Sequence, residues 1–397
     1  MMYLVRGGSW LSVAQFAVSL SGFVLTMVLA NLLSPEHLGE YRFLIAGFTL
    51  VSILALPGMR TALRESTPKG YRGNLTLAFS AMAKWGLLGS VVSLCIAAYY
   101  FIQDNSGLAL GFIVIAFATP LYNAGTGYLE YLTALKKVRH TALYTTATRV
   151  VVLVATVLVA LMFPHLAWVI LIPYLFGVIL PNLWFHFKTV REYERPGDPV
   201  DPGITRYAGH ITAMTALGVV AGQLDKIFVW NFIGATALAF FYIAYTIPLA
   251  ISQYLQIVPT LAFAKFGEKD PRIIRQTLLP KILKYLLVIA LGVVLYIFAA
   301  PYIFMLIFPQ YMAAVPYSQV LMLTTLFAAF LPIKTYLTTL KATRNLYILS
   351  VIPPAVRILV AVLLIAPFGI WGAVCSLLIE GVIRTGLLLF FFLRTPR

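Results

Sequence analysis

A nine-residue stretch occurs twice in this chain and constrains its fold more than any other feature. Residues 131–139 read Tyr-Leu-Thr-Ala-Leu-Lys-Lys-Val-Arg, and residues 336–344, an offset of 205, are identical to them at six of nine positions. Three further matches keep the same order: 31–33 with 231–233 and 84–85 with 284–285 at an offset of 200, and 147–150 with 355–358 at 208. Because matches in register rarely arise by chance, the sequence predicts a duplicated unit of roughly 200 residues.

The hydrophobic pattern indicates that most of the chain lies in a membrane. Of its 397 residues, 61% are hydrophobic and only 11% are charged, whereas a soluble protein carries about 25% charged residues. A helix needs about 20 apolar residues to cross a bilayer. Twelve segments read as spans, at about residues 9–33, 41–57, 77–102, 108–134, 143–163, 166–186, 209–232, 236–261, 281–307, 315–339, 346–366 and 369–393.

Six spans in each repeat would place both halves the same way up, related by an axis along the membrane normal. We therefore predict an all-α polytopic membrane protein, with twelve transmembrane helices in two six-helix halves around a central cavity. The N-terminal lobe would cover residues 1–187 and the C-terminal lobe residues 209–397. Residues 188–208, rich in charge, Pro and Gly, would form a flexible cytoplasmic linker between them.

The basic residues predict the orientation in the membrane. The chain has 29 Lys and Arg against 13 Asp and Glu, a net charge of +16. The basic residues gather in alternate loops, at residues 60–72, 136–139, 188–206, 265–275 and 341–344, whereas the intervening loops are short and nearly free of them. The positive-inside rule places the basic loops and both termini in the cytoplasm. Topology and anionic membrane lipids then account for the charge, and no nucleic-acid partner is expected.

Two pairs of cations within the spans are related by the repeat. Lys84 corresponds to Lys284, and Arg149 corresponds to Arg357. An ionisable side chain within a span costs several kcal/mol unless it faces a cavity or a partner. One interpretation is a cationic cavity that takes an anionic head group, where arginine makes bidentate contacts to phosphate. The alternative is that the side chains snorkel to the membrane surface, which suits the two lysines better than the deeper arginines.

Five further ionisable residues within the spans are candidates for lining the cavity or for coupling transport to an ion: Asp225, Lys226, Glu130, Glu380 and Arg384. Glu380 and Arg384 lie four residues apart on one helical face, so an internal ion pair is expected. Asp225 and Lys226 are neighbours and point about 100° apart on a helix. One of these two is therefore expected to face the cavity and the other to brace a helix contact.

The tyrosines, histidines and cysteines give weaker evidence about a functional site than the charged residues do. Tyr122, Tyr128, Tyr131 and Tyr336 would offer stacking surfaces for sugars, although interfacial aromatic belts explain much of the aromatic content. The five histidines have no metal-ligand spacing, and Cys95 and Cys375 lie inside apolar segments. No metal, disulfide or other cofactor is expected.

Two stretches resemble the Wzx-type polysaccharide flippases of the multidrug/oligosaccharidyl-lipid/polysaccharide exporter superfamily. Residues 223–244 hold the acidic-basic pair Asp225-Lys226, a short Gly-Ala turn and an aromatic-rich next helix, and residues 33–41 resemble the same turn in the first half. The resemblance implies movement of a polyprenyl-diphosphate-linked oligosaccharide, by alternating access, from the cytoplasmic to the outer leaflet of the inner membrane for cell-surface polysaccharide synthesis. It implies Arg149 and Arg357 at the diphosphate, H⁺ or Na⁺ as coupling ion, and contact with polysaccharide polymerase machinery.

Two other functions compete with this one. A cation-coupled drug or metabolite antiporter would have the same fold, but such relatives often carry an acidic residue in the first span, and this chain has none there. A membrane glycosyltransferase or ligase would need catalytic carboxylates on large outer loops. The predicted outer loops here are short, with Glu36, Glu40 and Asp104 near them, so we expect a transporter and not an enzyme.

Overall fold

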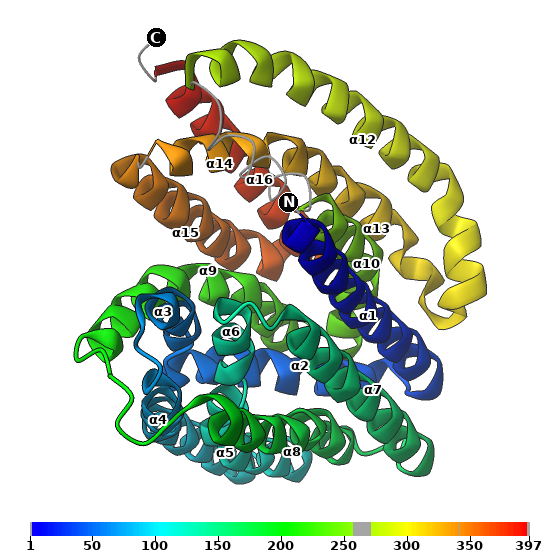
Figure 1. The fold of residues 1–397 in the computed structure, drawn as a ribbon. Coiled ribbons are helices and arrows are strands. Elements are labelled where there is room, and N and C mark those ends of the chain that lie inside the picture. The colour runs from blue at the N-terminus through cyan, green and yellow to red at the C-terminus, as the bar shows by residue number, and fades with distance from the viewer. Residues whose placement is uncertain (1, 257–270, 341, 395–397) are drawn as a thin grey trace. The chain divides into compact units, whose positions relative to one another are not determined.

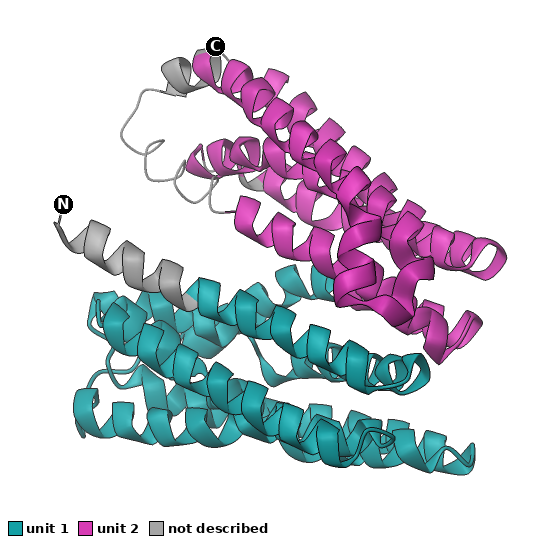
Figure 2. Ribbon diagram, turned by 90° about the vertical axis from the view of Figure 1, so that its right-hand side faces the viewer, with its two compact units in different colours: residues 1–219 teal, residues 220–397 magenta. Residues whose placement is uncertain are grey.

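The computed structural model describes residues 2–256, 271–340 and 342–394, and every regular element within those ranges is a helix (Figure 1). The helices form two compact units, residues 1–219 and residues 220–397 (Figure 2). The division between the units falls inside one helix, α9 (Ile204–Phe232). The linker predicted at residues 188–208 ends shortly before that point.

Unit 1 holds the first half of the duplicated sequence. Its long helices are α1 (Met2–Leu32), α2 (Pro35–Val51), α4 (Asn74–Ile102), α5 (Ser106–Ala124), α7 (Val138–Met162) and α8 (Ala167–Tyr193), with the first part of α9. Shorter helices join them: η1 (Ser52–Ala55), α3 (Gly58–Ser66), η2 (Thr67–Lys69) and α6 (Gly127–Ala134). Ser34 caps α2, because its side chain accepts a hydrogen bond from the backbone of His37, and Pro35 follows in the first turn.

Unit 2 repeats this order. The rest of α9 is followed by α10 (Ala235–Leu255), α12 (Pro271–Ile307), α15 (Thr343–Phe368) and α16 (Ile370–Arg394). Between α12 and α15 the chain forms four shorter helices: η3 (Pro309–Ala314), α13 (Val315–Met322), η4 (Leu323–Phe330) and α14 (Leu331–Thr339). The turn from α15 to α16 passes through Gly369 at φ +60°, a left-handed conformation that glycine adopts without strain.

Twelve helical segments in the described residues are long and apolar enough to cross a membrane, which confirms the predicted fold class. They run over Gln15–Leu32, Pro35–Ala55, Asn74–Ile102, Ser106–Ala134, Val138–Met162, Ala167–Tyr193, Ile204–Phe232, Ala235–Leu255, Thr277–Ile307, Pro309–Thr339, Arg344–Phe368 and Ile370–Arg394. Each overlaps one predicted span. The predicted basic loop at residues 265–275 falls mostly outside the described residues.

The duplicated stretches have the same local structure. Each closes a short helix, α6 or α14, and turns into a long one, α7 or α15. In the first copy, the N–H of Lys137 donates to the carbonyl of Leu132 at 2.8 Å. In the second, the N–H of Ala342 donates to the carbonyl of Leu337, the equivalent residue, at 3.1 Å. The tyrosine that opens each copy is buried in the hydrophobic core of its own unit. The repeat therefore preserves a turn and the packing beneath it.

Residues 194–203, the part of the predicted linker between α8 and α9, contact the start of α4. Helix α8 continues to Tyr193, and the segment after it is held against the start of α4. The Glu194 carboxylate accepts hydrogen bonds from the N–H and the hydroxyl of Thr76, at 3.2 and 2.9 Å. The Asn74 side chain accepts one from the N–H of Asp201 at 2.9 Å. The first N–H groups of a helix have no partner within it, so Glu194 caps the start of α4, and Asn74 fastens the segment there.

Candidate functional site

In unit 1, Arg149 lies among tyrosines. It is half-buried on α7, and its guanidinium interacts electrostatically with the hydroxyl of Tyr122 on α5. Arg60 on α3 and Tyr174 on α8 interact with the same hydroxyl. The Tyr122 ring packs edge-on against Phe48, with ring centroids 4.8 Å apart, which fixes its orientation. No carboxylate of a described residue forms an ion pair with Arg149.

In unit 2, Arg357 belongs to a network of four charges. Its Nη2 donates to Oδ2 of Asp225 on α9 at 2.6 Å, and its Nη1 donates to Oε2 of Glu380 on α16 at 3.0 Å. Arg384, one turn beyond Glu380, donates to the other oxygen of that carboxylate, so the predicted ion pair is present. Tyr245 on α10 interacts electrostatically with all four. The network ties α9, α15 and α16 together, and its formal charges cancel.

The repeat shows which residues of unit 1 stand at the positions of the two carboxylates that pair with Arg357. At the offset of 200 residues that relates α1 to α9, the apolar Leu25 stands where unit 2 has Asp225. At an offset of 204, which aligns Gly177-Val178-Ile179 of α8 with Gly381-Val382-Ile383 of α16, the apolar Phe176 stands where unit 2 has Glu380. Unit 1 thus keeps the arginine without the two carboxylates. A buried charge needs a partner, and the groups around Arg149 are tyrosines together with a second cation, Arg60.

The repeat-related lysines have a different setting. Lys84 and Lys284 are exposed on α4 and α12. Large apolar side chains on the same faces are also exposed, among them Leu87 and Leu88 near Lys84, and Leu287 and Val288 near Lys284. Such surroundings favour snorkelling along the apolar surface of the helix.

The remaining candidates make local contacts. Lys226 folds back along α9, where its Nζ donates to the carbonyl of Gly222 at 2.7 Å and to Oε1 of Gln223 at 2.9 Å. Asp225 points instead to Arg357, so the two neighbours do diverge. Glu130 lies 3.7 Å from Arg64, an ion pair exposed enough to contribute little stability. Among the described residues, no group of His, Cys, Asp and Glu is arranged to hold a metal ion.

Three of the four tyrosines predicted to stack on sugars are unavailable for that role. Tyr128 and Tyr131 are 0% exposed and Tyr336 is 2% exposed. The Tyr128 hydroxyl donates to Oδ1 of Asn182 at 2.7 Å, which satisfies it within the core. These side chains were misread because apolar periodicity does not separate a core tyrosine from a cavity tyrosine. Tyr122 remains as the tyrosine next to a candidate cation.

Sequence reasoning missed one contributor to the site in unit 1. Arg60 was counted among the loop residues that set topology, yet it reaches the same hydroxyl as Arg149.

A protein-family model matches the N-terminal two thirds of the sequence. Residues 4–263 match the model of a family described as polysaccharide biosynthesis protein. The chain belongs to this family. No curated protein matches the sequence of this chain at a significant level.

Solved structures of transporters share the fold of this polysaccharide biosynthesis family member. One is titled lipid II flippase MurJ in an inward closed conformation, with a TM-score of 0.72 and 16% identity over 97% of this chain and 87% of that one. Another is an inward-facing multidrug resistance MATE family transporter of the MOP superfamily, with a TM-score of 0.61 and 12% identity over 97% of each chain. A third, a MOP superfamily transporter from Pyrococcus furiosus, has a TM-score of 0.60 and 11% identity over 98% and 95% of the two chains.

Proposed function

We propose that this protein is a flippase that moves a polyprenyl-diphosphate-linked oligosaccharide from the cytoplasmic to the outer leaflet by alternating access, and that it catalyses no covalent reaction. The family supports a role in polysaccharide biosynthesis. The fold is shared with a lipid II flippase. The observation that carries the proposal is Arg149, a cation within a membrane helix that no described carboxylate neutralises.

The chemistry around Arg149 suits a diphosphate. A guanidinium presents two parallel N–H donors that match two phosphate oxygens. The Tyr122 hydroxyl, near both Arg149 and Arg60, would add a neutral donor. A diphosphate carries more than one negative charge, and two guanidinium groups around one hydroxyl would compensate it where water is scarce. Arg149 would bind the anion, Tyr122 would orient it, and Arg60 would add a second positive charge.

Arg357 would have a second role, because its charge is already taken by Asp225 and Glu380. A substrate phosphate would reach Arg357 only by displacing a carboxylate or after one is protonated. We therefore place the first phosphate contact at Arg149. Asp225, Glu380 and Arg384 are our candidates for coupling transport to H⁺ or Na⁺.

The basic loops support an inner-membrane protein with both termini in the cytoplasm. Diphosphate capture would then begin on the side that holds the loop cations, and the glycan would be delivered to the side where the polymerase machinery acts. Membrane lipids and that machinery are the partners we propose.

The test is glycan export by substituted proteins in a strain that lacks the native gene. Arg149→Ala should abolish export while membrane abundance stays within about twofold of wild type, because Arg149 pairs with no carboxylate of the described residues. Arg149→Lys should restore part of the export, since lysine keeps the charge and loses the bidentate geometry. Lys84→Ala, an exposed cation on α4, is the matched control and should export normally. Wild-type export by Arg149→Ala would refute the assignment of the anion site.

A second function, cation-coupled antiport of a drug or metabolite, is favoured by one observation. Asp225 and Glu380 are buried carboxylates in a membrane helix bundle whose fold is shared with MATE transporters. Drug-resistance assays with the same variants separate the two functions. Efflux that depends on Asp225 and is indifferent to Arg149 would favour the antiporter.

A further inference from the structure

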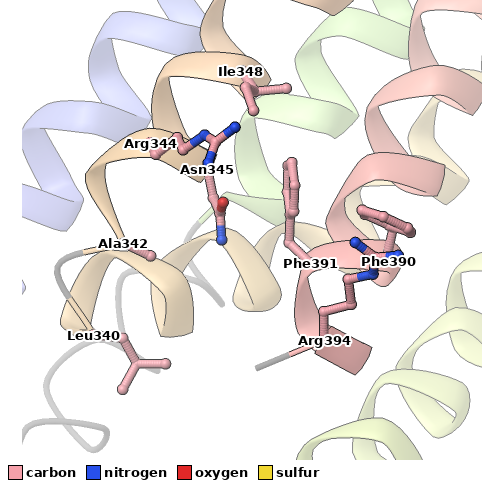
Figure 3. Close-up of a pocket in the computed structure, with 8 residues that line it drawn as sticks. All are labelled: Leu340, Ala342, Arg344, Asn345, Ile348, Phe390, Phe391 and Arg394. Carbon is pink, nitrogen blue, oxygen red and sulfur yellow. The ribbon is translucent and has the colours of Figure 1, made fainter. Parts of the chain in front are cut away.

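A cavity of about 620 Å³ in unit 2 lies apart from the charged network described above. It is bounded by the first turn of α15, the last turns of α16 and the loop before α15. Figure 3 shows Arg344, Asn345 and Ile348 of α15 facing Phe390, Phe391 and Arg394 of α16, with Leu340 and Ala342 nearby. The cavity thus combines two guanidinium groups and an amide with aromatic and aliphatic side chains, which makes its lining amphipathic.

The two arginines of this cavity are available to an anion. No carboxylate of a described residue lines the cavity, and neither Arg344 nor Arg394 forms an ion pair with one. Arg394 is held in place by an aromatic ring, because its guanidinium carbon lies 4.4 Å from the centre of the Phe390 ring. A cation–π contact of this kind orients the guanidinium without neutralising it. Both arginines are exposed, so a ligand can reach them.

The position of the cavity along the helices narrows the class of ligand. Arg344 opens one membrane-spanning segment and Arg394 closes the next. Their guanidinium groups therefore lie at the boundary between the apolar layer and water, which is where phospholipid phosphates lie. Basic pockets between membrane helices at such a boundary bind anionic lipid head groups. The apolar part of the lining would contact the glycerol and the upper acyl chains.

A related arrangement occurs in unit 1. Trp184 and Lys188 lie four residues apart on α8, as Phe390 and Arg394 do on α16, and the Lys188 ammonium lies 5.6 Å from the Trp184 ring. These two residues line a cavity of about 540 Å³ together with Phe187, Val190 and Arg191. An aromatic residue followed four positions later by a cation thus recurs at the same end of the sixth span in both halves.

We propose that the cavity lined by Arg344, Asn345, Phe390, Phe391 and Arg394 binds the phosphate of an anionic membrane phospholipid. The two guanidinium groups and the Asn345 amide donate hydrogen bonds to the phosphate oxygens. The ligand is a resident lipid that stabilises the end of the α15–α16 pair, and it is distinct from the transported lipid-linked glycan. This inference does not depend on the flippase function.

The test measures thermal stabilisation of the full-length protein in a neutral detergent by short-chain phosphatidylglycerol, with phosphatidylcholine of the same chain length as the zwitterionic comparison. Wild type should be stabilised by phosphatidylglycerol and much less by phosphatidylcholine. Arg344→Gln combined with Arg394→Gln should bind phosphatidylglycerol roughly 30-fold more weakly, from the usual contribution of two cations at an anionic lipid surface. Arg72→Gln with Arg195→Gln, which removes the same charge from exposed positions outside the cavity, should bind as wild type does.

Other arms of the same experiment identify the ligand. Inorganic phosphate alone should not stabilise the protein, because it lacks the apolar part. Equal binding by wild type and the Arg344/Arg394 double variant would overturn the site, and so would equal stabilisation by the two phospholipids. Stabilisation by a polyprenyl diphosphate and not by phosphatidylglycerol would overturn the proposal and assign the cavity to the transported lipid.

Discussion

Replacing Arg357 by alanine should destabilise the C-terminal half strongly. The substitution removes the guanidinium that pairs with Asp225, which is 2% exposed, and with Glu380, whose side chain is 8% exposed. Removing one partner of a buried ion pair costs about 3–5 kcal/mol, because a charge stays behind without compensation. Glu380 keeps Arg384, whereas among the described residues Asp225 keeps the backbone N–H of Lys226 at 2.8 Å as its hydrogen-bond donor. We therefore expect the lower end of that range, about 3 kcal/mol.

The matched control is Arg384→Ala. Arg384 pairs with the same Glu380, but its side chain is 41% exposed. The contribution of such an ion pair is about 0–1 kcal/mol. The expected order is therefore set by burial and not by the number of charges removed, since each substitution removes one arginine.

Thermal unfolding of the purified protein in detergent, followed by loss of the size-exclusion peak of the folded protein, provides the measurement. A loss of about 3 kcal/mol corresponds to a fall in Tm of roughly 6–12 °C for a unit of this size. Arg357→Met with Asp225→Leu and Glu380→Met should recover most of the loss, because apolar side chains of similar volume replace a buried triad at little cost. An unchanged Tm for Arg357→Ala would refute the argument, because it would mean that the pair is solvated in the folded protein.

Three further predictions concern other parts of the chain. Half-burial raises the pKa of Glu194 above its usual 4.5, so folding favours the protonated form. The free energy of unfolding should therefore rise as the pH is lowered from 7 toward 4.5. Glu194→Gln should flatten this slope in unfolding curves measured against pH. In a background without native cysteines, a cysteine that replaces Lys137 should not react with a membrane-impermeant thiol reagent in intact cells, whereas one that replaces Asp104 should react. The reverse pattern would show that the predicted orientation in the membrane is wrong. Gly372→Ala should lower Tm, since an added Cβ would come within 2.2 Å of the Leu364 carbonyl oxygen; a change of less than 1 °C would show that the α15–α16 contact relaxes freely.

The sequence by itself determined the elements and their order. Long apolar runs predict membrane helices because the bilayer offers no partner for an exposed backbone N–H or carbonyl, and a helix satisfies both within one segment. The sequence repeat also predicted that these helices form two equivalent halves. The matching turns at Lys137 and Ala342 show how closely the two copies agree. These are local consequences of composition and register, so they can be read from the chain alone.

The tertiary structure decided which charges are partnered. Arg149 and Arg357 occupy equivalent places in the repeat, and their own sequence contexts do not distinguish them. The difference comes from other helices: Asp225 on α9, 132 residues away, and Glu380 on α16 neutralise Arg357, whereas Tyr122 on α5 stands beside Arg149. Whether a charge inside a membrane is neutralised depends on the side chains that packing brings next to it. The sequence of one apolar helix does not show which other helix supplies those side chains.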